Sequence, residues 1–181
     1  MEIPDFIIDG LRLKLKQVLF FYEIAVFFVC NNKKGELFLI YCSDIDNWDY
    51  SIVCVNQKKL IEMLDNKISI DEIFISAQRK WKVTVDDFDV PTEAIRVNSF
   101  SENMLPKKDA FFGKLDDDIR VFLDELRKGV DWEPQKNFFA KNFGQYFQIL
   151  RKFTYDDLID RVDVLEYQKI RKKYNREFSY A

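Results

Sequence analysis

Three cysteines are the residues of this chain that most readily suggest chemistry, because thiolates bind metal ions and act as nucleophiles. They are Cys30, Cys42 and Cys54, with eleven residues between each and the next. The chain contains no histidine, which excludes a Ser/His/Asp triad, a Cys/His pair and a His-ligated zinc ion. Any enzyme chemistry would therefore depend on carboxylates, lysine, tyrosine or a carboxylate-bound divalent ion.

The predicted pairing of strands keeps the three sulfur atoms apart. If Asn32 lies opposite Gly35 in a first hairpin, Cys30 and Cys42 are about 16 Å apart, at ~3.3 Å per strand residue. A second hairpin then places Cys54 on the face of the sheet opposite to Cys42. Sulfur ligands of one metal ion must lie about 2.3 Å from it. We therefore interpret the cysteines as small buried hydrophobic residues, with structural zinc and a reactive thiol as less favoured alternatives.

An acidic loop is the main candidate for a metal site. The segment DIDNWD places Asp44, Asp46 and Asp49 close together. It begins like an EF-hand loop, but that motif requires glycine at position six and glutamate at position twelve, where this chain has Asp49 and Val55. An EF-hand is excluded. A magnesium ion held by the three aspartates remains an alternative to a solvated hairpin loop.

Positive charge is concentrated near the C-terminus, in the segment KIRKKYNREF. Such charge late in a helix is favourable for the helix dipole, and this is the simpler interpretation. The alternative is contact with the phosphate backbone of a nucleic acid, through Lys169, Arg171, Lys172, Lys173 and Arg176. The net charge of -3 gives no general attraction to polyanions. Neither a GxxxxGK[ST] nor a GxGxxG loop occurs, and we expect no cofactor.

The periodicity of the first half predicts an antiparallel meander. Four strands are expected over residues 10–22, 24–30, 37–42 and 51–55, and a fifth over Trp81–Val85. The two central strands are apolar at nearly every position, so both of their faces should be covered. Asn56 is a suitable N-cap for a helix over 57–67, and Ser69 with Glu72 has the capping-box pattern for a helix over 70–78.

The second half is predicted to be helical after an irregular connection. Turns and short pieces are expected over 86–114, followed by helices over 116–128, 134–153 and 155–178. The predicted fold class is α+β. The predicted domain organisation has an antiparallel sheet with two short helices over 1–90, an irregular connection over 91–114, and a helical region over 115–181.

Residues 8–77 have a recognisable pattern of strands and turns. Its parts are an opening strand with Gly10–Leu13, a strand at Phe21–Phe28, a hairpin at Asn32–Leu39, a strand end at Ile52–Asn56 and a helix exit at Asn66–Phe74. This pattern resembles a family of uncharacterised bacterial domains. The chain departs from the pattern where Ala25 replaces a proline and Asn66-Lys67 replaces a glycine. The resemblance implies an accessory role in bacterial or phage genomes and a partner-binding function, and it supplies no site residues.

Together these observations predict a non-enzymatic interaction module that binds another macromolecule, within a bacterial or phage conflict system. A protein partner or self-association is expected, because the last third has more aromatic residues than a core stripe needs, including Phe138, Phe139 and Tyr146. Nucleic-acid binding and a magnesium-dependent enzyme are the alternatives. The acidic N-terminus, the short apolar runs and the odd number of cysteines favour a cytoplasmic protein without membrane contact.

Overall fold

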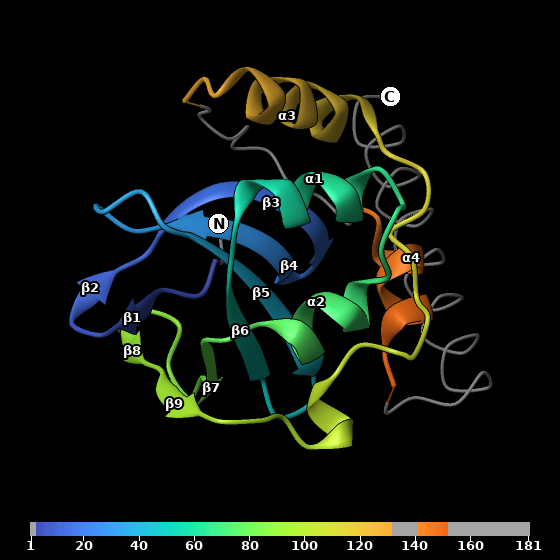
Figure 1. Cartoon of the computed structure of the whole chain (residues 1–181). Helices are drawn as coiled ribbons and strands as arrows, with labels where there is room; N and C mark the ends of the chain where they lie inside the picture. The colour runs from blue at the N-terminus through green and yellow to red at the C-terminus, as the bar shows by residue number, and fades with distance from the viewer. Residues whose placement is uncertain (1–2, 132–140, 152–181) are drawn as a thin grey trace, which may run out of the picture.

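A six-stranded antiparallel sheet forms the frame of the fold, in a computed structural model that describes residues 3–131 and 141–151. The strand order is β3-β4-β5-β6-β7-β9 (Figure 1). The strands are β3 (Lys14–Tyr22), β4 (Ile24–Asn31), β5 (Leu37–Asp44), β6 (Asp49–Val55), β7 (Lys80–Thr84) and β9 (Ile95–Val97). The predicted α+β class and meander are confirmed, and β9 extends the meander by one strand.

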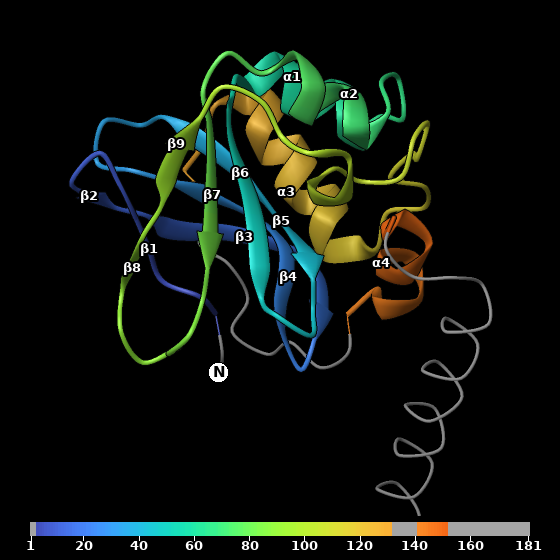
Figure 2. The same cartoon turned by 90° about the horizontal axis from the view of Figure 1, so that it is seen from below.

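A second, small sheet lies beside the β7–β9 end of the first (Figure 2). Its strands are β2 (Leu11–Arg12), β1 (Phe6–Ile8) and β8 (Thr92–Glu93), with β1 antiparallel to β2 and parallel to β8. Its side chains pack into the larger sheet, since the ring centroid of Phe6 lies 5.3 Å from that of Tyr50 and 6.3 Å from that of Phe28. The single strand predicted for residues 10–22 is thus divided between β2 and β3.

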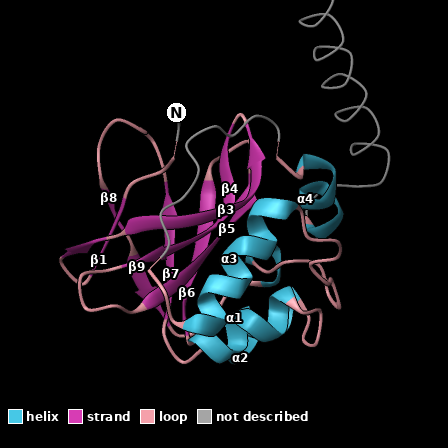
Figure 3. Ribbon diagram, turned by 90° about the horizontal axis from the view of Figure 1, so that it is seen from above, coloured by secondary structure: helices cyan, strands magenta, loops and turns pink. Residues whose placement is uncertain are grey.

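The helices gather on the other side of the six-stranded sheet (Figure 3). They are α1 (Gln57–Leu64), α2 (Ile70–Ser76), the 3-10 helix η1 (Glu102–Met104), α3 (Asp117–Lys128) and α4 (Phe143–Ile149). The aromatic contact between Tyr41 of β5 and Phe74 of α2, at 5.7 Å between ring centroids, shows how this layer meets the sheet. No helix in the described part of the chain is long and apolar enough to cross a membrane.

The central strands are covered on both faces, as their composition predicts. Every residue of β4 except Asn31 is buried, and every residue of β5 except Leu37. The helices cover one face and the small sheet covers part of the other. This arrangement explains why two strands without a polar side can exist in the middle of an antiparallel sheet.

The register of the β4–β5 hairpin differs by one residue from the prediction. Asn32 pairs with Glu36 instead of Gly35, through a hydrogen bond of 3.2 Å from its N–H to the Glu36 carbonyl. Gly35 has φ +79 and donates its N–H to the Asn32 carbonyl at 3.0 Å. These contacts define a three-residue loop that ends in a left-handed glycine, a common form of β-hairpin connection.

The register of the β5–β6 hairpin, in which Cys42 pairs with Tyr50, also differs by one residue from the prediction. The two differences move the cysteines relative to one another. Phe38 of β5 lies opposite Cys30 on one side and opposite Cys54 on the other. Cys42 is four residues beyond Phe38 on the same strand, so alternation puts it on the same face as Cys54. The prediction that Cys42 and Cys54 lie on opposite faces is therefore wrong. Because Phe38 lies between them on the middle strand, its large side chain separates Cys30 from Cys54.

The caps of the described helices agree with the sequence in position. The Asn56 side chain accepts the N–H of Lys59 at 2.8 Å at the start of α1, and α3 ends at Gly129 with φ +68. Ser69 occupies the N-cap of α2 but makes no side-chain capping bond.

The continuous helix predicted for residues 134–153 is wrong. Asn142 has φ +53, which a right-handed helix does not allow, and α4 begins only at Phe143. The helix predicted for 155–178 lies outside the described residues. Within the predicted irregular connection, β8 and β9 take part in the two sheets, so this stretch contributes to both.

Candidate functional site

Tyr146, one of the aromatic residues predicted as a partner surface, is placed differently from that expectation. Tyr146 is completely buried, and its hydroxyl donates a hydrogen bond of 2.8 Å to the carbonyl oxygen of Cys42. It therefore belongs to the core, where its ring lies 5.6 Å from that of Phe147. Phe138 and Phe139 lie outside the described residues. The basic group predicted for nucleic-acid contact also lies outside them, namely Lys169, Arg171, Lys172, Lys173 and Arg176.

The acidic loop uses its carboxylates to build its own turn. Asp44 is buried, and its side chain accepts the N–H groups of Asp46 at 3.0 Å and Asn47 at 3.3 Å. Asp49 accepts the hydroxyl of Thr84 on β7. In the part of the chain that the structure describes, no group of three or more acidic, cysteine or histidine side chains is placed to hold a metal ion. The geometry thus gives the magnesium alternative no support.

The two buried cysteines are kept in the thiol form. Burial raises the pKa of Cys30 far above its usual value, and the nearby Asp5 charge raises it further. Burial also raises the pKa of Cys42 to about 12, against smaller opposing effects of hydrogen bonds. A thiol in this state is a poor nucleophile and a poor metal ligand at neutral pH.

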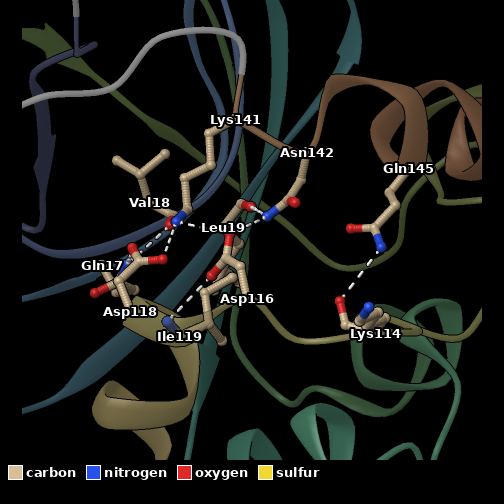
Figure 4. Close-up of polar contacts among 10 residues, drawn as sticks. All are labelled: Gln17, Val18, Leu19, Lys114, Asp116, Asp118, Ile119, Lys141, Asn142 and Gln145. Atoms are coloured by element: carbon tan, nitrogen blue, oxygen red, sulfur yellow. Dashed lines mark hydrogen bonds and ion pairs between the residues drawn. The ribbon is translucent and has the colours of Figure 1, made fainter.

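A cluster of charged and amide side chains joins α3 and α4 to the edge strand β3, and we call it the Lys141 cluster (Figure 4). Lys141 forms ion pairs with Asp116, at 2.9 Å, and with Asp118. Gln17 of β3 donates to Asp118 at 2.8 Å, and Asn142 donates to Asp116 at 2.9 Å. A backbone hydrogen bond adds a further link to β3, because the N–H of Phe21 donates to the Lys141 carbonyl at 2.7 Å.

The two carboxylates of the Lys141 cluster have opposite pKa shifts. Burial raises the pKa of Asp118, and a hydrogen bond with Asp116 raises it further. Burial works in the same direction on Asp116, but hydrogen bonds with Asp118, Lys141 and Asn142 outweigh it and lower that pKa to about 2. Asp116 is also the N-cap of α3, accepting the N–H of Ile119 at 3.2 Å. The polar atoms of the cluster are thus directed at one another, as in a structural joint.

A second group of ionisable residues surrounds an open cleft of about 690 Å³, which we call the Arg79 cleft. Three segments form its walls: the end of the β4–β5 loop, the passage from β6 into α1, and the passage from α2 into β7. The N–H of Cys54 donates to the carbonyl of Arg79 at 3.1 Å and ties the last two together. The lining residues are Gly35, Glu36, Leu37, Cys54, Val55, Asn56, Gln57, Lys59, Ile73, Ser76, Ala77, Gln78 and Arg79.

Arg79 is held in place inside this cleft by two neighbours. Its Nη2 atom lies 2.5 Å from Oε1 of Glu36 and donates to the sulfur of Cys54 at 2.9 Å. Its guanidinium carbon lies 5.8 Å from the centroid of the Trp81 ring, a cation–π distance. Glu36 is fixed in turn by Asn32, which donates to it at 2.8 Å. The arginine is therefore oriented before any ligand arrives.

The ionisable groups around Arg79 are held in forms that do not suit catalysis. Hydrogen bonds from Asn32 and Arg79 lower the pKa of Glu36, so the carboxylate is a weak base. Burial raises the pKa of Cys54, although the Arg79 charge acts against this, so the group remains a thiol at neutral pH. General bases and nucleophiles need the opposite shifts.

Two lysines at the start of α1 complete the charge of the Arg79 cleft. Lys58 and Lys59 occupy the first turn of α1, which contains no acidic residue. Positive charge at this end of a helix is unfavourable by about 0.3–1 kcal/mol. Within the described ranges, neither lysine has an ion-pair partner. Sequence reasoning did not find this site, although two lysines directly after a predicted N-cap were a visible signal.

A smaller hollow of about 260 Å³ continues the Arg79 cleft past the β4–β5 loop. Both hollows are lined by Gly35, Leu37 and Gln57. The smaller one extends to Phe122 and Leu126 of α3. Gln57 donates a hydrogen bond to the Leu126 carbonyl and so links α1 to α3. The Lys16–Asp131 ion pair also lines the smaller hollow and contributes no net charge there. We refer to the two hollows together as the groove, an elongated depression lined by charged and apolar residues.

Comparison with known proteins adds no relative to this picture. A scan against protein-family models and searches of curated proteins and of solved structures each gave no match. The resemblance of residues 8–77 to an uncharacterised bacterial domain family thus stays a likeness in strand and turn pattern. The function has to be argued from the geometry of the groove itself.

Proposed function

We propose that the protein is a non-enzymatic binding module that takes a segment of another macromolecule into the Arg79 cleft. One observation carries this proposal: the cleft is open and accessible, yet its ionisable groups are locked in unreactive forms. Glu36 is a weakened base, Cys54 is a protonated thiol, and Arg79 is paired with both. Such a set can recognise a ligand but has no group ready to transform one.

The shape of the groove supports a chain segment as the ligand. A small-molecule site is usually a single concave pocket with mostly apolar walls. Here a cleft with mixed polar and apolar walls continues into a second hollow through shared residues Gly35, Leu37 and Gln57. An elongated, mixed surface of this kind suits an extended segment that crosses it. A role in a bacterial or phage conflict system, in the cytoplasm, remains part of the proposal and draws on the sequence pattern alone.

The test compares partners captured by the full chain and by two matched tryptophan variants. Ser76 lines the cleft at the end of α2, and Ser76→Trp would fill it. Ile75, its neighbour, is 55% exposed and does not line the cleft, so Ile75→Trp is the control. Each immobilised protein is exposed to lysate from the source cells, and bound proteins are quantified by mass spectrometry.

We expect a defined set of proteins to be retained by the wild type and by Ile75→Trp but lost with Ser76→Trp. Circular dichroism must show that both variants keep the wild-type fold. If the two variants retain the same proteins in the same amounts, the cleft is not the binding site and the proposal fails.

A further inference from the structure

We propose, on the basis of the binding function above, that the ligand of the groove is an extended peptide segment rich in aspartate and glutamate. Its carboxylates would contact Lys59 and Arg79, and its apolar side chains would enter the hollow toward α3. This inference names the chemistry of the partner, which the proposed function leaves open.

The charge of the cleft is the first argument. Glu36 is the only acidic residue among the described residues that line it, and its charge is already neutralised by Arg79. Lys59 lies in the wall and has no ion-pair partner among residues 3–131 and 141–151, and Lys58 stands next to it in the first turn of α1. Lys34, which is exposed, directly precedes the lining residue Gly35. The excess is positive, so the complementary ligand is anionic.

The hydrogen-bonding capacity of Arg79 is the second argument. Only its Nη2 atom is engaged by Glu36 and Cys54, while Nη1 and Nε have no hydrogen-bond partner among the described residues. The side chain is 35% exposed in the cleft. A guanidinium group with one nitrogen anchored and the others open can still receive a carboxylate. Because Arg79 is held in advance, less conformational entropy is lost when the ligand binds.

The remaining walls favour a peptide over a nucleic acid. Partly exposed apolar side chains line both hollows, among them Leu37, Ala77 and Leu126. The one aromatic lining residue described, Phe122, is buried and presents no ring on which a base could stack. Single-stranded nucleic acids are bound through such rings together with a track of positive charge. An acidic peptide with apolar side chains matches both the cations and the apolar walls.

The test selects peptides on the immobilised full chain from a display library of random peptides about ten residues long, which span ~33 Å when extended. We expect the enriched peptides to carry net negative charge and at least one large apolar residue. A labelled enriched peptide is then titrated by fluorescence anisotropy against Lys59→Glu, and against Lys67→Glu as a control. Lys67 is exposed near the C-terminal end of α1 and does not line the groove.

Lys59→Glu should weaken peptide binding by at least about tenfold, and Lys67→Glu by less than about twofold. Because glutamate is favourable in the first turn of a helix, a loss of affinity in Lys59→Glu cannot come from unfolding of α1. Added salt should weaken wild-type binding as well.

Three outcomes would overturn this inference. The first is that neutral or basic peptides are enriched, or that no peptide is enriched. The second is that Lys59→Glu binds the acidic peptide as tightly as the wild type. The third is that a labelled single-stranded oligothymidylate competes with the peptide at equal affinity, which would assign the groove to nucleic acid. In each case the capture experiment with Ser76→Trp still decides independently whether the cleft binds a macromolecule.

Discussion

The helices α3 and α1 begin in opposite electrostatic settings. Asp117 and Asp118 occupy the first turn of α3, where negative charge is favourable. Lys141 forms ion pairs with the carboxylates of Asp116 and Asp118. The first turn of α1 instead carries Lys58 and Lys59, and no described residue pairs with them. The charges of the Lys141 cluster are paired within the fold. At the Arg79 cleft, positive charge remains without a partner among the described residues.

This difference separates stability from recognition within one chain. The Lys141 cluster joins three elements, and its polar atoms bond to one another within that joint. The Arg79 cleft keeps unfavourable charge and open donors, which the fold itself does not need. Local rules of helix design that are broken at an accessible site are a physical sign of function. The following predictions test whether the two regions differ in this way.

Lys141→Met should produce the largest loss of stability. It removes the cation that faces two partly buried carboxylates, and we expect the free energy of unfolding to fall by about 2–3 kcal/mol. Urea unfolding measures the change. Lys128→Met is the control, because Lys128 is exposed and its pair with Glu125 at 3.8 Å contributes about 0–0.5 kcal/mol. Equal losses in the two variants would remove the distinction between a structural joint and ordinary surface charge.

The cysteines should differ in their rates of alkylation in the native state. Cys54 lines the Arg79 cleft, whereas Cys30 and Cys42 are buried, so Cys54 should react at least about tenfold faster than either. It should still react more slowly than free cysteine, because burial raises its pKa. Timed alkylation followed by mass spectrometry measures the three rates. Similar rates at all three positions would show that the cleft is not open as described.

Asp116→Asn should change the response to acid. The pKa of Asp116 in the folded protein is about 2, below its ordinary value of 3.8. The ionised form therefore contributes stability above about pH 4, and this contribution is lost as the pH falls toward 2. We expect about 1 kcal/mol, reduced from the full linkage value because the side chain is 34% exposed.

Asparagine keeps the N-cap of α3 while it removes the charge. The unfolding free energy of Asp116→Asn should therefore fall less steeply than that of the wild type between pH 4 and 2, in a series of urea titrations. Parallel curves for the two proteins would contradict the assignment of this pKa.

Lys59→Glu should have the smallest effect on stability, and in the opposite direction. A glutamate three residues after the Asn56 cap completes a capping-box pattern and suits the helix dipole, so the free energy of unfolding should rise by about 0.5 kcal/mol. The same change should abolish most of the peptide affinity. Thermal unfolding gives the stability term, and a lowered melting temperature would show that Lys59 has a structural role.

The elements with strong local signals could be predicted from the sequence. The central strands, the Asn56 cap and the Gly129 end of α3 all depend on residues close to one another in the chain. The one-residue error in register arose at Gly35, because a left-handed glycine serves both two-residue and three-residue hairpin loops. That step places Cys30 opposite Phe38. The face of Cys54 relative to Cys42 depends instead on the β5–β6 hairpin, where Cys42 pairs with Tyr50, and this second register also differs by one residue from the prediction.

The elements without local signals were not predictable in the same way. β1 and β8 pair over two positions only, Phe6 with Thr92 and Ile7 with Glu93, which is too short for a periodic pattern. The aromatic-rich stretch that contains Tyr146 predicts a partner surface, but a sheet with two apolar faces needs that much aromatic volume in its core. The Arg79 cleft combines three separate segments, so only their packing could reveal it.

The order of strands in the larger sheet also has a consequence for how the chain reaches its native state. From β3 to β7 each strand pairs with the next strand along the chain, so the entropy lost in closing each loop is small. Contacts such as Tyr41 with Ile149, 108 residues apart, cannot form until distant segments meet. We expect the meander to assemble early, with the β1–β8 pair and α4 docking afterwards, so that the folding rate is set by those late closures.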